Sequence, residues 1–126
     1  MSYAESIMRR YNRNGLIGEE DSHAVMIEDH SDPDGRMYRL EYRSTSDGRK
    51  AIAYCIFNPW GGGGDPNAGE DYHTGHVAED GFICLGGEAV HDLESSPYDL
   101  DYTIRRARYW CTAFSVLKEN GEFPNL

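Results

Sequence analysis

Positive charge is scarce in this sequence of 126 residues, because 12 Lys and Arg stand against 22 Asp and Glu, a formal net charge of −10. Such a field repels a phosphate backbone, which excludes nucleic acid as the main partner. No apolar run approaches the ~18 residues that a membrane helix needs, and the first residues lack the apolar centre of a signal peptide. We therefore expect a cytoplasmic protein that binds neither nucleic acid nor membrane.

Cysteine is also rare, and the chain carries three of them. An odd number without the spacing of a disulfide framework predicts free thiols in a reducing compartment. Cys55 lies inside an apolar run, and Cys111 lies on the apolar stripe of a helical segment, so both are expected to fill the core. Cys84 has different surroundings, described below.

The sequence shows no internal repeat and no linker, which predicts one domain over residues 1–126. A helix is expected over residues 2–14, because Ser2 and Glu5 have the spacing of a capping box and Gly15 follows its end. The stretch GLIGEEDS that comes next is expected to be a loop. A second, longer helix is expected over residues 100–118, where apolar residues recur every three or four positions: Leu100, Ile104, Ala107, Cys111, Phe114 and Leu117. Asp99 or Asp101 can cap its start, and Arg105, Arg106 and Arg108 lie off the stripe and are expected to be solvated.

Three segments between these helices have the character of strands: residues 23–30, 37–44 and 51–57. Turn residues separate them, including a Pro-Asp-Gly sequence, which favours an antiparallel meander. Consecutive strands followed by a helix predict the α+β class. Residues 58–72 contain four consecutive glycines and are expected to form an irregular surface loop, in which Trp60 is the candidate to contact a partner.

Cys84 stands in the stretch HTGHVAEDGFICLGG, after two apolar residues and before two glycines. It is either a small core residue or a thiol that the glycines bring to the surface, since glycine permits irregular backbone paths. Acidic neighbours such as Glu79 and Asp80 disfavour a thiolate. That environment suits exchange with an already activated thioester better than proteolysis.

The same segment, Thr74 to Gly87, resembles the active-site segment of ubiquitin-conjugating enzymes. In that family His-Pro-Asn is followed by an aliphatic residue, a polar turn with a glycine, and Ile/Val-Cys-Leu. An ungapped alignment matches Cys84 to the thioester cysteine, Gly81 to the turn glycine and His76 to the asparagine.

The chain also departs from the family pattern. Thr74 and Gly75 replace His-Pro, a glycine-rich tract replaces a proline-rich one, and few residues follow the last helix. In this trimmed form the chain is similar to ubiquitin-conjugating-like proteins of bacteria and their viruses, which often belong to antiviral operons. The resemblance implies a ubiquitin-conjugating-like fold with an N-terminal helix, an antiparallel meander, an active-site loop and a crossover helix.

The resemblance also implies a function that needs no cofactor. Cys84 would carry a ubiquitin-like modifier as a thioester, taken from an activating-like enzyme and passed to an amine of an acceptor protein. His76 would stabilise the oxyanion or act as a base for the amine. Asp99 and Asp101 fall where the family orients the amine, although capping of the helix explains them equally well.

Four alternatives remain from the sequence. One is a free-standing structural or inhibitor domain. A non-catalytic adaptor of the same fold would bind ubiquitin-like proteins without forming a thioester. A zinc site could use His73, His76, Cys84 and His91, since zinc accepts nitrogen and sulfur ligands together. A cysteine hydrolase would need a basic partner beside the sulfur.

Overall fold

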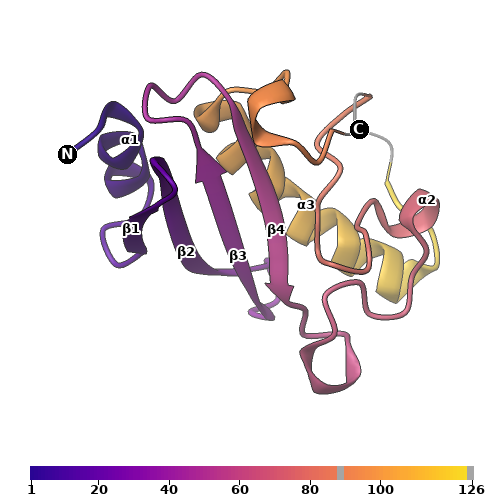
Figure 1. Cartoon of the computed structure of the whole chain (residues 1–126). Coiled ribbons are helices and arrows are strands. Elements are labelled where there is room, and N and C mark those ends of the chain that lie inside the picture. Colours follow the sequence, from indigo (N-terminus) through magenta and orange to yellow (C-terminus); the bar gives the residue numbers. More distant parts are fainter. Residues whose placement is uncertain (88–89, 125–126) are drawn as a thin grey trace.

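A helix, a four-stranded antiparallel sheet and a long final helix follow one another in the computed structural model, which describes residues 1–87 and 90–124 (Figure 1). The helices are α1 (Tyr3–Tyr11), α2 (Tyr72–Gly75) and α3 (Leu100–Asn120), with 3-10 turns η1 (Gly62–Gly64) and η2 (Leu93–Ser95). The strands are β1 (Leu16–Glu20), β2 (His23–Ser31), β3 (Met37–Ser44) and β4 (Ala51–Phe57), and they lie in the order β1-β2-β3-β4. This confirms the α+β class and the antiparallel meander, an arrangement that is not unique to ubiquitin-conjugating enzymes.

Helix α1 begins at the predicted capping box but ends earlier than predicted. The Ser2 hydroxyl accepts from the backbone N–H of Glu5, and the Glu5 carboxylate accepts from Ser2. The last helical residue is Tyr11, because Asn12 leaves the helical conformation and its side-chain amide donates to the carboxylate of Glu28 at 2.9 Å. The contact with β2 therefore decides where the helix stops.

The predicted loop after α1 is wrong, since GLIGEEDS contains strand β1 and the hairpin turn to β2. β1 is an edge strand in which only Ile17 is half-buried, so its sequence shows no alternation of apolar and polar residues. Its pairing with β2 comes from backbone hydrogen bonds and a two-residue turn. Asp21 and Ser22 both have positive φ in that turn, the conformation of a tight hairpin.

The core lies between one face of the sheet and α3, which crosses that face in Figure 1. The predicted apolar stripe of α3 is buried throughout, and it packs against Met26, Tyr38, Leu40 and Tyr42. Cys55 and Cys111 belong to this core, as predicted. A smaller cluster on the other face of β4 joins Ile52 to Phe82 and Leu93, with Tyr54, Tyr72 and Ala78 packed around them. We call it the outer cluster.

Arg108 was expected to be solvated, but it forms an ion pair with a fully buried carboxylate. Two of its nitrogens contact the carboxylate of Glu28, at 2.7 and 3.0 Å. Tyr42 also donates to Glu28, at 2.5 Å, and Asn12 completes the set. Burial opposes ionisation most strongly, yet these hydrogen bonds outweigh it and lower the pKa of Glu28. The network joins α1, β2, β3 and α3.

We expect Arg108→Met to lower the free energy of unfolding by about 3 kcal/mol at neutral pH, because it leaves the Glu28 charge buried without its partner. A lowered pKa means that ionised Glu28 stabilises the fold above about pH 4.3, and that this contribution is lost as the pH falls through the folded-state value. The difference in the free energy of unfolding between wild type and variant should therefore become smaller below about pH 4. Urea unfolding across this range measures it.

Arg39→Met is the matched control, because Arg39 pairs with Asp29 while both side chains are largely exposed. It should change stability little at any pH. Equal effects of the two substitutions would contradict the importance given to the Glu28 network.

Candidate active site around Cys84

Cys84 stands at the end of a tight hairpin that begins at His76. The backbone N–H of Cys84 donates to the carbonyl of His76 at 2.9 Å, and Val77 pairs with Ile83. Inside the hairpin, Ala78 bonds to Phe82 and Gly81 bonds to Ala78, each at 2.9 Å. We call residues 76–84 the Cys84 hairpin.

The returning arm of this hairpin is attached to the free edge of β4. The N–H of Cys55 donates to the carbonyl of Gly81 at 2.8 Å, and the N–H of Ile83 donates to that of Ala53 at 3.0 Å. Gly81 has φ +96°, and a Cβ at this position would lie 2.1 Å from the carbonyl oxygen of Cys55. Only glycine permits so close an approach with this conformation.

Helix α3 holds the chain on the other side of Cys84. The carbonyl of Leu85 accepts from the Tyr102 hydroxyl at 3.1 Å and from Nε of Arg106 at 3.2 Å. Arg106 was expected to be solvated, and this contact gives it a structural role instead. Cys84 is thus fixed by β4 before it and by α3 after it.

The thiol of Cys84 is partly exposed, whereas Cys55 and Cys111 are buried. Burial raises the pKa of Cys55 to about 12 and raises that of Cys111 well above its ordinary value. Sγ of Cys84 donates to the carbonyl oxygen of Gly86 at 3.0 Å. Cys84 is therefore neither sealed in the core like the other two cysteines nor fully exposed.

Helix α2 precedes the hairpin and places Tyr72 beside Cys84. Asp71 caps the helix by accepting from the N–H of Thr74 at 2.8 Å, and the carbonyl of Tyr72 accepts from the N–H of His76 at 2.9 Å. The Tyr72 ring packs on the outer cluster. Sequence reasoning missed this residue, although it lies one helical turn before His76 and could have been found from that spacing.

His76 ends α2 in the left-handed conformation, with φ 56°. Asn, Asp and His are the residues most enriched there after glycine, so the family's asparagine would fit the same backbone. The imidazole packs against the Phe123 ring, with centroids 4.4 Å apart. Its pKa is lowered, first by burial and then by the nearby His73, which favours the neutral ring at pH 7. Between His76 and Cys84, both described, the hydrogen bond runs through the backbone and not through the imidazole.

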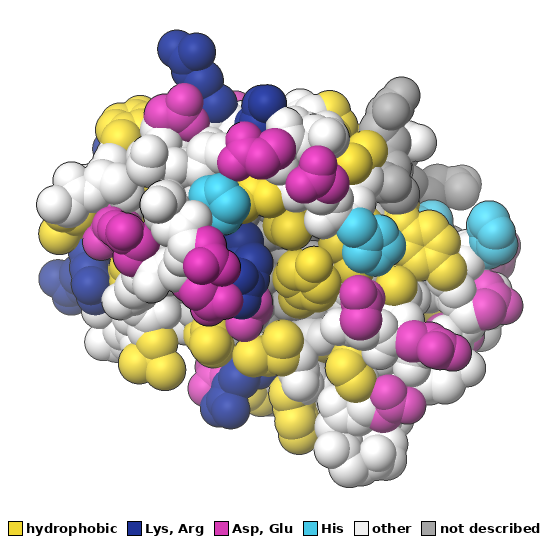
Figure 2. Space-filling view, in the orientation of Figure 1, with side chains coloured by type: hydrophobic (Ala, Val, Ile, Leu, Met, Phe, Trp, Pro, Cys, Tyr) yellow, Lys and Arg dark blue, Asp and Glu magenta, His cyan; other side chains and the backbone are white. Residues whose placement is uncertain are grey.

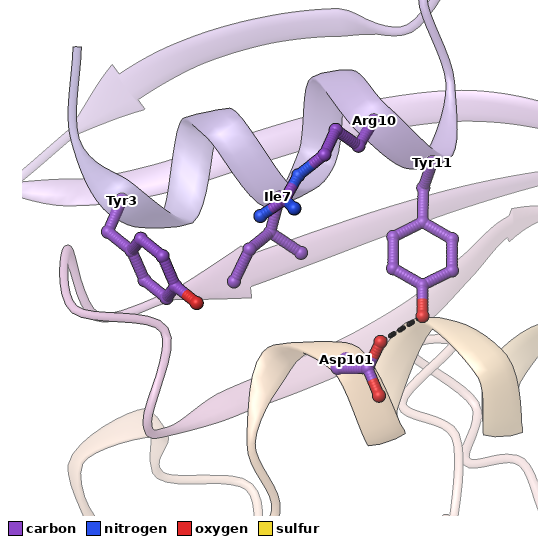
Figure 3. Close-up of a pocket in the computed structure, with 5 residues that line it drawn as sticks. All are labelled: Tyr3, Ile7, Arg10, Tyr11 and Asp101. Atoms are coloured by element: carbon purple, nitrogen blue, oxygen red, sulfur yellow. Dashed lines mark hydrogen bonds between the residues drawn. The ribbon is translucent and has the colours of Figure 1, made fainter.

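The two predicted aspartates have contacts that account for them within the fold. Asp99 is the N-cap of α3 and accepts from the N–H of Tyr102 at 2.8 Å. Asp101 accepts from the Tyr11 hydroxyl and from Arg105, and it lines a groove between α1 and α3 together with Tyr3, Ile7 and Arg10 (Figure 3). Its side chain therefore faces α1 and not the Cys84 hairpin.

The zinc alternative finds no support in the geometry. Within residues 1–87 and 90–124, no three His, Cys, Asp or Glu side chains gather closely enough to hold a metal ion. His91 instead stacks on Phe82, with ring centroids 3.8 Å apart, and its Nε2 lies 3.8 Å from Asp80.

On the side of the molecule where α2 lies, Figure 2 shows acidic and histidine side chains, whereas Lys and Arg are seen toward the side of α1.

Trp60 was expected to be an exposed contact for a partner, but it is part of the fold. Its indole N–H donates to the hydroxyl of Ser115 at 3.1 Å, and its ring packs on the core. The guanidinium of Arg36 covers the ring at 4.3 Å. The glycine-rich loop is therefore held against α3 by its tryptophan.

Comparison with protein-family models, with curated proteins and with solved structures finds no match for this chain. Among the described helices, none is both long and apolar enough to cross a membrane.

We expect a small alkylating reagent to label Cys84 in the native protein and to label Cys55 and Cys111 only after denaturation, because the reagent needs an accessible sulfur. Peptide mapping by mass spectrometry after a short exposure to iodoacetamide measures this. Labelling of Cys55 or Cys111 as fast as Cys84 would contradict this prediction, because it would show that the Cys84 thiol is no more accessible than the other two.

Proposed function

We propose that this protein is a ubiquitin-conjugating-like transferase that carries a ubiquitin-like modifier on Cys84. The observation that supports it most is the partly exposed thiol of Cys84 at the end of a hairpin braced by β4 and α3, in a chain with the order of elements that the resemblance implies. A residue braced on both sides meets the requirement that a nucleophile be preorganised.

The proposed reaction has two acyl transfers. In the first, the sulfur of Cys84 attacks the carbonyl carbon of the modifier's thioester on an activating-like enzyme. A new carbon–sulfur bond forms, the donor's bond breaks, and the proton of Cys84 passes to the leaving donor sulfur or to solvent. In the second, an amine of the acceptor protein attacks the same carbon, an amide forms, Cys84 leaves as a thiolate, and the amine gives up a proton.

His76 is the residue of this chain best suited to assist. A neutral imidazole offers one N–H donor and one acceptor nitrogen. The donor can stabilise the oxyanion of the second step, and the acceptor can take the proton of the amine. Asp99 and Asp101 have no part in the proposal, because the cap of α3 and the contact with α1 account for them.

The direct test combines the purified protein with a ubiquitin-like protein, an activating-like enzyme and ATP. We expect an adduct that a reducing agent releases, because a thioester is cleaved by thiols. Cys84→Ser should give an adduct that resists reduction or none, and Cys84→Ala should give none. Non-reducing and reducing gels read the result.

Binding of the modifier without any adduct, in wild type and in Cys84→Ala alike, would contradict a transferase. That result would favour the adaptor, the alternative of the same fold in which the thiol has no chemical role.

A second prediction concerns His76. His76→Asn should keep most of the transfer to an amine, because asparagine suits the left-handed backbone and offers an N–H donor. His76→Ala should slow that transfer by about 10²-fold, the scale seen on removal of one oxyanion donor, while loading of Cys84 and the melting temperature change little. Single-turnover discharge to free lysine measures it. Rates in both variants equal to that of the wild type would show that His76 has no part in the transfer.

A further inference from the structure

The hydroxyl of Tyr72 is a buried polar group without a partner of normal hydrogen-bond geometry. Its oxygen is covered, and among the described residues it is the one side-chain atom in this condition. Leaving such a group unpaired is unfavourable, so buried polar groups in folded proteins usually have a partner. An exception next to a reactive residue points to a role in another state of the site.

Two side chains act on this hydroxyl, that of Cys84 first and that of Tyr98 after it. Burial is the main cause that raises the pKa of the Tyr72 phenol, and the adjacent Cys84 side chain is the next. The backbone agrees with this proximity, because Tyr72 bonds to His76 and His76 bonds to Cys84, each at 2.9 Å. The raised pKa also means that the phenol keeps its proton and remains a donor at neutral pH.

Two groups near the sulfur can form hydrogen bonds with it in different roles. The carbonyl of Gly86 accepts from the thiol at 3.0 Å, a bond that only a protonated sulfur can donate. A phenolic O–H can only be a donor toward a thiolate, and a hydrogen bond to a charged acceptor is roughly twice as strong as one between neutral groups. The Tyr72 hydroxyl therefore gains a good partner when the sulfur becomes negative.

We infer that Tyr72 is a catalytic residue whose hydroxyl donates a hydrogen bond to Sγ of Cys84 whenever that sulfur is a thiolate. The inference rests on the proposed function for its meaning in catalysis. Cys84 is a thiolate twice in that cycle, as it attacks the donor thioester and as it leaves when the amine attacks. Tyr72 lowers the free energy of both states and keeps its own proton throughout.

The test is Tyr72→Phe, which removes the oxygen and keeps the ring in the outer cluster. The rate of Cys84 alkylation by iodoacetamide is measured as a function of pH, with the site confirmed by mass spectrometry. We expect the midpoint of the profile to rise by about one pH unit in the variant, because the thiolate has lost a charge-assisted donor. The melting temperature should stay the same or rise, because an unpaired buried group has been removed.

Tyr54→Phe is the matched control, because Tyr54 packs on the same outer cluster. Cys84 is not among the groups that shift the pKa of the Tyr54 hydroxyl. Its profile should coincide with that of the wild type. A Tyr72→Phe midpoint that is unchanged or lower, or a shift of the same size in Tyr54→Phe, would overturn the inference. So would a wild-type Cys84 that no alkylating agent reaches at any pH.

This readout needs no modifier protein, so it separates the two proposals. A shifted midpoint without any thioester would sustain the role of Tyr72 toward the sulfur and reject the transferase. A thioester with an unshifted midpoint would do the reverse. If both hold, discharge of the loaded protein to free lysine should also be slower in Tyr72→Phe, since the leaving thiolate has lost its donor.

Discussion

The close approach of Gly81 to β4 is the constraint on which the candidate site depends. A carbonyl of the hairpin and an amide of β4 can meet at 2.8 Å because residue 81 has no side chain to fill the space beside Cys55. The hairpin then continues the sheet for a few residues, and Ile83 enters the core while Cys84 does not. The absence of a side chain at Gly81 thus permits the pairing with β4, and the alternation of an extended segment then turns Ile83 toward the core and Cys84 away from it.

Cys84 has rigid support on both sides, and one polar group beside it lacks a hydrogen-bond partner. β4 and α3 hold the backbone on either side of Cys84, and the Glu28–Arg108 pair ties α3 to the sheet. The thiol has an acceptor in the Gly86 carbonyl, whereas the Tyr72 hydroxyl beside it has no partner of normal geometry. In the proposed function this arrangement is useful, because a thiolate at Cys84 supplies the acceptor that the Tyr72 hydroxyl lacks.

The parts of the fold that were predictable are those in which a periodic pattern coincides with burial. The stripe of α3 and the strands 23–30, 37–44 and 51–57 meet this condition, and their predicted limits agree closely with the structure. β1 could not be seen, because an exposed edge strand is specified by its partner and its turn. The role of Arg108 was missed for a related reason, since a position off the apolar stripe still reaches a buried carboxylate on another element.

The candidate site also has one part that could be predicted from the sequence and another that could not. Local sequence placed a cysteine after a glycine turn, and the exposure of Cys84 agrees with that reading. It could not show that Asp101 faces α1, that Trp60 packs against α3, or that Tyr72 lies beside the sulfur, since each depends on contacts between distant segments.

The central claim is that the sulfur of Cys84 accepts an acyl group, and a synthetic peptide with a C-terminal glycine thioester tests it without any partner protein. Intact-mass spectrometry of the purified protein after incubation should show one peptide adduct, which hydroxylamine removes and which Cys84→Ala does not form. A protein that remains unmodified, or an adduct that persists in Cys84→Ala, would contradict the account.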